Sequence, residues 1–275
     1  MSDNDERFAK MQDALSFLGK LEVTSVKTTL CAPFEDDLSS FGFKRVEWAP
    51  YMWIGDEKLS KDHRLFTENK VFSIGLASVL ACLQLNLKAG DKVLDMCAAP
   101  GIKSLYLQLI HDKKLDLYVN DTSHVRLERL RALFSAFSVP LPIFSNQPGQ
   151  SLHNRYNEAF FDAILIDAPC SGEGNILKGD TEALKTWSQA KVKRLAEIQR
   201  KLIKTGQKLV KTDGQLVYAT CTLNQYENEG TIKKAGIELQ DVQNTVLEQI
   251  QLEDSTAVRL LSSVYSIGFF VAKLK

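Results

Sequence analysis

The stretch KVLDMCAAPGIKS, residues 92–104, changes character at its middle. The apolar run KVLDM predicts a buried strand, the small residues after it predict a loop, and the following LYLQLIH predicts a helix. Small residues at positions 98, 99 and 101 let backbone N–H groups approach a ligand closely at the start of a helix. The loop is not GxGxxG, and many strand-to-helix turns carry glycine and proline for their geometry alone. The stretch therefore predicts a strand–loop–helix unit and a candidate ligand loop.

The same alternation of strands and helices continues after this unit. Strands are predicted over residues 115–120, 141–145, 161–167, 214–220 and 267–274, and helices over residues 74–85, 123–137 and 191–210. A long polar loop is expected after residue 145. Strands that alternate with helices indicate βαβ units, an α/β fold and a mostly parallel, doubly wound sheet. Such sheets bind ligands at the carboxyl ends of their strands, beside the point where the strand order reverses.

The first part of the chain has a different pattern. Its segments predict a helix over residues 7–19, a strand over 22–30, a short helix over 34–42 and one strand over 44–54. The polar residues 56–70 are typical of a linker or an exposed loop. We therefore predict a small α+β subdomain over residues 1–68 and a larger domain over residues 69–275.

Composition describes an ordinary globular protein and excludes several classes. The chain has 275 residues, of which 44% are apolar and 25% are charged. Its start is acidic and polar, and no apolar run approaches eighteen residues, so we expect no signal peptide, no membrane contact and a cytoplasmic location. Five cysteines, an odd number, argue against a disulfide framework, and their spacing predicts no metal site. We expect a monomer.

The net charge is balanced, but its distribution is not. Basic and acidic residues number 34 each, so the total gives no sign of a nucleic-acid partner. Residues 185–211, in contrast, carry nine basic residues and one acid, Glu197. A charged run on a helix is usually a solvated face, and a surface that binds a polyanion is the sharper alternative.

Chemically reactive side chains follow several of the predicted strands. Asp121 stands where a doubly wound fold places a carboxylate on ribose hydroxyls, although it could equally cap the next helix. The string DAPCSGEG places Asp167 and Cys170 after one apolar run, and LVYATCTLN places Cys221 after another. A cysteine in a polar loop beside helix N-termini can act as a nucleophile. Turn residues or a reversible redox pair remain alternatives for either cysteine taken alone.

Five strings in one order resemble a known family: LDMCAAPGIKS, NDTSHVRLERL, ILIDAPCSGEGN, ALKTWS and LVYATCTLNQYENE. The chain is similar to the Nop/Sun family of S-adenosylmethionine-dependent RNA cytosine-5 methyltransferases, and most of all to its bacterial RsmF-like branch, which acts on small-subunit ribosomal RNA. The resemblance implies a Rossmann-like class I methyltransferase fold, S-adenosyl-L-methionine as cofactor and an RNA-binding N-terminal subdomain.

The resemblance also implies roles for individual residues. Carbon 5 of cytosine is a poor nucleophile, and thiolate attack on carbon 6 makes it reactive. Cys221 matches the family's nucleophile, and Cys170 the residue that assists product release by removing the carbon-5 proton. Asp167 matches the residue that binds the cytosine edge, and Lys103 the loop lysine beside base and cofactor. The implied cofactor contacts are Cys97, Ala98, Ala99, Pro100, Gly101, Ile102, Lys103, Asp121, Arg126 and Asp167.

The implied partner is RNA, whose target base must be unstacked and flipped into the pocket. Small-subunit ribosomal RNA is the first expectation and transfer RNA the alternative. The implied RNA contacts are Trp187, Lys191, Lys193 and Arg194. Ile102 replaces a small residue of the family loop, and the loop of residues 145–150 lacks an expected aspartate, for which Asn146 or Gln147 could substitute. These departures motivate another hypothesis, a catalytically weakened RNA-binding factor of ribosome assembly. A thiol redox protein is a third.

Overall fold

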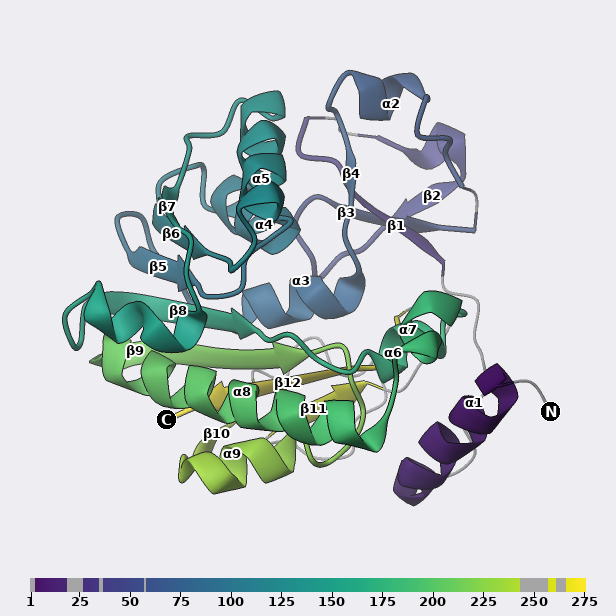
Figure 1. Ribbon diagram of the computed structural model, residues 1–275. Helices are drawn as coiled ribbons and strands as arrows, with labels where there is room; N and C mark the ends of the chain where they lie inside the picture. The colour runs from purple at the N-terminus through teal and green to yellow at the C-terminus, as the bar shows by residue number, and fades with distance from the viewer. Residues whose placement is uncertain (1–2, 19–26, 35–36, 57, 243–256, 261–265) are drawn as a thin grey trace.

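The computed structural model describes residues 3–18, 27–34, 37–56, 58–242, 257–260 and 266–275 (Figure 1). Its larger sheet has the strand order β10-β12-β9-β8-β5-β6-β7, with β11 paired to β12. The parallel strands are β5 (Lys92–Asp95), β6 (Asp116–Asn120), β7 (Ile143–Ser145), β8 (Phe161–Asp167) and β9 (Val210–Thr220). β12 (Phe269–Leu274) runs antiparallel to β9, β10 (Leu239–Gln240) and β11 (Ala257–Leu260). The predicted α/β class with a mostly parallel sheet is confirmed.

Helices cover both faces of this sheet, because successive strand residues point to opposite sides. Ala163 and Leu165 pack in one core cluster with α3 (Leu76–Leu83), α4 (Ile102–Ile110) and α5 (His124–Ala136). Ile164 and Ile166 pack in a second cluster with α8 (Gln189–Leu209) and α9 (Glu229–Ala235). Figure 1 shows the two groups of helices on opposite sides of the sheet. β8 is therefore buried on both faces, which explains its continuous apolar run.

The strand order reverses beside β5. From β5 the chain proceeds outward to β6 and β7, and it then returns to place β8 and β9 on the other side of β5. At such a point the loops after neighbouring strands diverge and leave a crevice at the carboxyl edge. The predicted polar loop after β7 contains a short 3₁₀ helix, η3 (Gly149–Asn154), whose Leu152 is fully buried. No helix in the described part of the chain has both the length and the apolar character of a membrane span.

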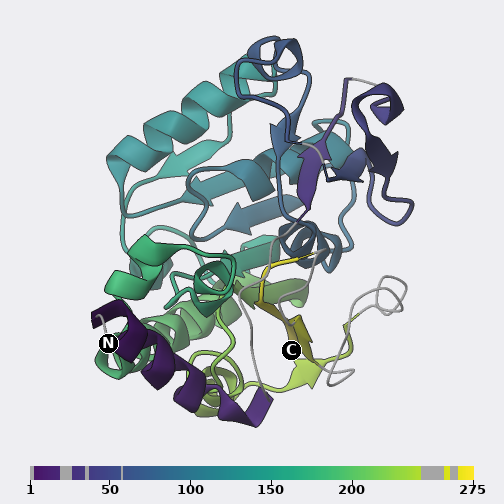
Figure 2. The ribbon, with the colours of Figure 1, turned by 90° about the vertical axis from the view of Figure 1, so that its right-hand side faces the viewer.

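Strands from the first part of the chain form a second, antiparallel sheet with the order β2-β3-β1-β4, which Figure 2 shows away from the N-terminal helix. Its strands are β1 (Thr28–Cys31), β2 (Phe43–Arg45), β3 (Met52–Gly55) and β4 (Phe72–Ser73). A 3₁₀ turn, η2 (Ser39–Phe41), precedes β2. Residues 22–26 of the predicted first strand lie outside the described residues. The sheet extends past residue 68 to β4, and its core merges with that of α3, so the small unit packs on the larger domain.

Two predictions for this region are wrong. Residues 44–54 form a hairpin rather than one strand, because Pro50 has no N–H to donate and Tyr51 has a φ of 61°. Residues 56–70 are not simply a linker, since they contain α2 (Arg64–Thr67), whose Leu65 is fully buried. The segment therefore packs on an apolar cluster through Leu65, with the partly buried Leu59 and Phe66 beside it.

The first helix, α1 (Asp3–Ala14), begins and ends earlier than predicted and is followed by a 3₁₀ turn, η1 (Ser16–Leu18). Met11 and Leu15 are fully buried. They pack in one cluster with Leu184 of α7 (Thr181–Lys185) and with Ile176, which ends α6 (Glu173–Ile176). The N-terminal helix therefore rests on the segment that follows β8.

Candidate active site

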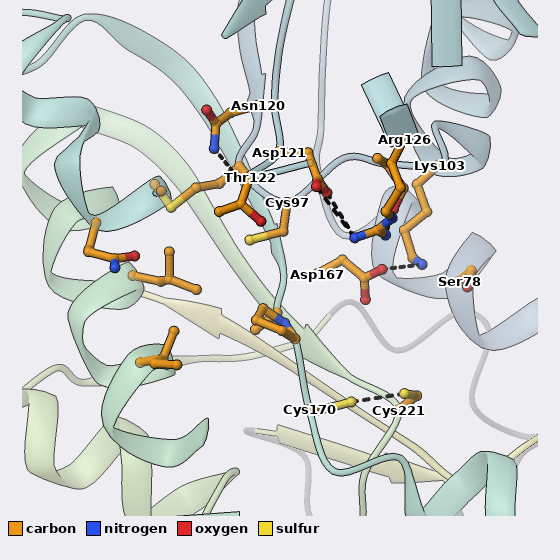
Figure 3. Close-up of a pocket in the computed structure, with 18 of the residues that line it drawn as sticks. Ser78, Cys97, Lys103, Asn120, Asp121, Thr122, Arg126, Asp167, Cys170 and Cys221 are labelled. Carbon is orange, nitrogen blue, oxygen red and sulfur yellow. Dashed lines mark hydrogen bonds and ion pairs between the residues drawn. The ribbon is translucent and has the colours of Figure 1, made fainter. Parts of the chain in front are cut away.

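A pocket of about 400 Å³ opens where β5, β6, β8 and β9 end (Figure 3). Its lining includes Cys97 after β5, Asp121 after β6, Asp167 at the end of β8 and Cys221 after β9. Cys170, three residues after Asp167, also faces it. The structure thus brings together at one rim the side chains that the strand-end pattern selected.

The loop between β5 and α4 packs tightly on α5. Gly101 has a φ of 105°, and a Cβ at this position would lie 2.4 Å from Cγ of Leu130, so only glycine fits. Within residues 97–103, Cys97, Ala99 and Lys103 line the pocket. Ile102, in contrast, packs against the apolar core beside α4 and is not among the pocket residues. The Ile102 side chain, which replaces a small residue of the family loop, therefore does not line the pocket.

Asp121 and Arg126 join the loops after β5 and β6. A guanidinium nitrogen of Arg126 lies 3.2 Å from the Asp121 carboxylate, and another donates to the carbonyl of Ala99. Asp121 also accepts a hydrogen bond from the backbone N–H of Ser123, but the cap of α5 is Ser123 itself. The alternative that Asp121 serves as the helix cap is therefore wrong.

Polar atoms without partners lie next to this ion pair. Asn120 Oδ1 and Gln147 Nε2 are buried and have no hydrogen-bond partner among the described residues. Asn120 lines the pocket, and its Nδ2 donates to the carbonyl of Gln147. Asn146 donates to the backbone carbonyl of Asp121. Because an unpaired buried polar group is costly, such atoms often pair with a bound ligand or an ordered water.

Lys103 and Asp167 form a second ion pair in the pocket lining, with 2.6 Å between Nζ and Oδ2 (Figure 3). Burial alone would lower the pKa of Lys103, but the adjacent Asp167 carboxylate outweighs burial and raises that pKa. Lys103 therefore remains an ammonium and fixes the orientation of the carboxylate.

Two thiols lie below this pair, with 2.8 Å between the sulfur atoms of Cys170 and Cys221. The hydrogen bond between them, together with burial, raises the pKa of Cys170 well above its ordinary value. Cys170 is therefore the thiol that keeps its proton. Burial also raises the pKa of Cys31 and Cys82, in line with their expected role as small core residues.

A buried polar network that the sequence analysis missed holds the two cysteine loops together. The backbone N–H of Ser171, next to Cys170, donates to the Glu227 carboxylate at 3.0 Å. The backbone N–H of Leu223 donates to the Glu173 carboxylate at 3.0 Å, and the amide of Asn224 donates to both carboxylates. Burial raises the pKa of Glu227. The clue was the density of acids and amides in TLNQYENE, about fifty residues after the single acid of SGEG.

Residues 82–275 match the family model of the 16S rRNA methyltransferases RsmB/F. The chain belongs to this family. It is 34% identical over 193 residues to a ribosomal RNA small subunit methyltransferase F of Vibrio cholerae, an alignment that covers 67% of this chain and 40% of the relative. A relative of the same name from Shewanella is 36% identical over 197 residues, covering 66% and 39%. The chain thus spans about two fifths of the length of these relatives.

Solved structures agree with the fold described above. A methyltransferase homolog protein from Pyrococcus horikoshii superposes with a TM-score of 0.74 at 25% identity, over 98% of this chain and 90% of that one. NSun6 from the same organism, solved with SFG, gives a TM-score of 0.70 at 24% identity, over 82% and 57%. These likenesses support the class I methyltransferase fold.

Trp187 of this RsmB/F-family chain does not fit its predicted role as an RNA contact. Its side chain is 2% exposed, and Nε1 donates to the Glu173 carboxylate at 2.9 Å. The aromatic ring thus anchors the polar network instead of facing solvent. Lys193 and Arg194 are exposed on α8, and Lys191 donates to the Thr186 hydroxyl. No group of three or more potential metal ligands occurs among the residues that the structure describes.

Asp95 ends β5 beneath the pocket and is almost fully buried. It accepts a hydrogen bond of 2.6 Å from the Ser104 hydroxyl. Burial nevertheless raises its pKa from 3.8 to about 7. The carboxyl group is therefore largely protonated in mildly acidic solution and ionises near neutrality.

We expect this carboxyl group to make stability depend on pH. The folded protein binds the Asp95 proton more tightly than the unfolded chain, so the contribution of this group to the free energy of unfolding falls as the pH rises from about 4 to about 7. Asp95→Asn removes this titration, and its Tm should fall about 5 °C less over that range than the wild-type Tm. Thermal unfolding followed by circular dichroism measures the difference. Asp213→Asn, at an exposed position, is the control, and parallel curves for Asp95→Asn and wild type would contradict the assignment.

Proposed function

We propose that this chain transfers a methyl group from S-adenosylmethionine to carbon 5 of a cytosine in small-subunit ribosomal RNA. The observation that carries the proposal is the pair of thiols, Cys170 and Cys221, with 2.8 Å between their sulfur atoms at the rim that also holds Lys103 and Asp167. The curated relatives, named ribosomal RNA small subunit methyltransferase F, support the RNA substrate.

The residues of the pocket suit the cofactor. A volume of about 400 Å³ is within the range of small-molecule sites, and its lining combines charged, polar and apolar side chains. Asp121 stands where a carboxylate would accept hydrogen bonds from ribose hydroxyls, with Arg126 holding it in place. Bound S-adenosylmethionine would supply a methyl group on a sulfonium.

The cofactor assignment predicts a specific loss of affinity. Asp121→Asn removes the charged acceptor and leaves Arg126 without its ion pair, so the Kd for S-adenosylmethionine should rise by about tenfold to a hundredfold. Isothermal titration calorimetry measures this Kd without any RNA. Asp116→Asn makes the same change at the exposed, opposite end of β6 and should leave the Kd unchanged. Equal affinities for both variants would contradict the assignment.

The reaction divides between the two cysteines. The Cys221 thiolate forms a bond to carbon 6 of cytosine, and the displaced electron pair makes carbon 5 nucleophilic. Asp167, oriented by Lys103, hydrogen-bonds the base edge and stabilises its protonated ring nitrogen. After methylation Cys221 is bonded to carbon 6 and no longer carries a charge that raises the Cys170 pKa, so Cys170 releases its own proton to solvent and takes the carbon-5 proton. The electrons of that C–H bond restore the ring double bond, and Cys221 leaves carbon 6 as a thiolate.

RNA contacts outside the pocket are also part of the proposal. The exposed Lys193 and Arg194 lie on the solvent side of α8, where they can contact the RNA backbone. Residues 1–68 are proposed as an RNA-binding subdomain.

Transfer of tritium from labelled S-adenosylmethionine to RNA tests the function. The RNA should come from cells that lack the gene, so that the target cytosine is unmodified. We expect 5-methylcytidine in the 16S rRNA, located by bisulfite sequencing with and without the enzyme. Label confined to transfer RNA would show that transfer RNA, not ribosomal RNA, is the substrate. No label in any RNA would contradict the proposal.

A further inference from the structure

Asn175 lies beside the sulfur that the proposed reaction uses first. Its Nδ2 is 3.4 Å from Cys221 Sγ, on the pocket lining. The same sulfur is 2.8 Å from Cys170 Sγ. Cys221 therefore has two hydrogen-bonding neighbours, and both lie on the segment that follows β8.

The backbone around Asn175 is fixed against the Cys221 loop. The preceding Gly174 donates its N–H to the carbonyl of Cys221 at 3.1 Å. A Cβ on Gly174 would lie 1.8 Å from the carbonyl oxygen of Gly268, so α6 approaches both neighbours as closely as glycine permits. The carbonyl of Asn175 accepts a hydrogen bond from the N–H of Asp180. This packing holds the Asn175 side chain at the sulfur.

The direction of the hydrogen bond distinguishes the two thiols. An amide N–H can only donate, so Cys221 must be the acceptor in its contact with Asn175. When the thiol pair loses one proton, the remaining proton lies between the two sulfur atoms. Negative charge on Cys221 is stabilised by two donors, Asn175 and Cys170, whereas charge on Cys170 would have only the Cys221 thiol. The arrangement thus favours a thiolate at Cys221.

We propose that Asn175 is a positioning residue that donates to the Cys221 sulfur and makes Cys221, not Cys170, the thiolate of the pair. The proposal rests on the function proposed above, in which Cys221 attacks the base. In this role Asn175 contacts the nucleophile Cys221 and takes no part in binding the cofactor. The other charged groups around the thiols are Lys103, Asp167 and Glu227, and they stay unchanged in the variants below.

Alkylation of the thiols by iodoacetamide, measured across pH without RNA or cofactor, tests this inference. Peptide mapping by mass spectrometry gives a separate profile for each cysteine. In the wild type, Cys221 should react with a midpoint at lower pH than Cys170. Asn175→Ala should raise the Cys221 midpoint by about one pH unit. Asn175→Asp, nearly identical in shape, replaces the donor by a carboxylate and should raise that midpoint further.

Asn154→Ala removes the same side chain from an exposed position of η3, outside the pocket, and should leave the profile unchanged. Methyl transfer by Asn175→Ala should lose about tenfold in kcat at neutral pH, recover toward higher pH and keep its KM for RNA. An unchanged Cys221 midpoint in both Asn175 variants would overturn the inference, as would a changed KM with an unchanged midpoint. The alkylation needs no RNA, so it tests Asn175 independently of the function. If the Asn175 variants shift the Cys221 midpoint but the wild type methylates no RNA, the proposed function is refuted and the role of Asn175 stands.

Discussion

Replacing Cys221 with alanine is expected to reduce methyl transfer to RNA by at least about a thousandfold. Without a bond to carbon 6, carbon 5 of cytosine does not become nucleophilic enough to take a methyl group. Cys170 is nearby, but burial still raises the pKa of its thiol after the hydrogen bond to Cys221 is lost, so it should not replace the missing thiolate. Single-turnover assays with tritiated S-adenosylmethionine measure the loss directly.

The control for this experiment is Cys31→Ala. It removes a thiol that is fully buried in the N-terminal sheet, away from the pocket, and activity should be retained. Binding of S-adenosylmethionine to Cys221→Ala should also persist, since Cys221 is placed to act on the base. A Cys221→Ala enzyme that keeps a tenth of wild-type activity would show that Cys221 is not the nucleophile.

The second large effect is expected from Cys170→Ala, which should stop the reaction after the methyl group has moved. Carbon 5 then keeps its proton, so the bond between carbon 6 and Cys221 cannot break by elimination. Turnover should fall by about a hundredfold or more, while a covalent complex of protein and RNA accumulates. The complex should survive denaturing gel electrophoresis.

The double variant Cys170→Ala, Cys221→Ala provides the matched test, because it should form no covalent complex. Its behaviour separates a bond through Cys221 from attachment at any other thiol of the chain. Normal turnover by Cys170→Ala without a trapped complex would remove Cys170 from the reaction and leave it a structural role in the loop.

The central sheet was predictable because its strands lie between two layers of helices. Strand β8 was predicted over residues 161–167 and has those bounds, since a strand buried on both faces must be continuously apolar. The N-terminal sheet was harder to predict. Its hairpin turn at Pro50 lies inside an aromatic stretch, and α2 is held by one buried side chain, Leu65. Such short elements depend on contacts with residues far away in the chain.

The candidate site followed from the same edge of the sheet. Parallel strands bring their carboxyl ends together, so Asp121, Asp167 and Cys221 could be grouped without knowing any distance. The direction in which each side chain points and its hydrogen-bond partners could not be predicted in this way. Asn175 ends the string ILIDAPCSGEGN, and nothing in the sequence singles it out. Only the structure shows its amide beside the sulfur of Cys221, 46 residues away in the chain. Trp187 was misjudged because a basic segment surrounds it, whereas its ring and N–H fit the buried network.

The network of Ser171, Glu173, Asn224 and Glu227 has a consequence for protein engineering. Each of its hydrogen bonds between the two loops has one partner after β8 and the other after β9. A loop transplanted from a relative would bring half of these partners and would face a buried carboxylate or amide that it was not selected to match. Chimeric enzymes of this family should therefore exchange the two loops as one cassette. Grafts of a single loop should fold poorly even when every residue at the pocket surface is retained.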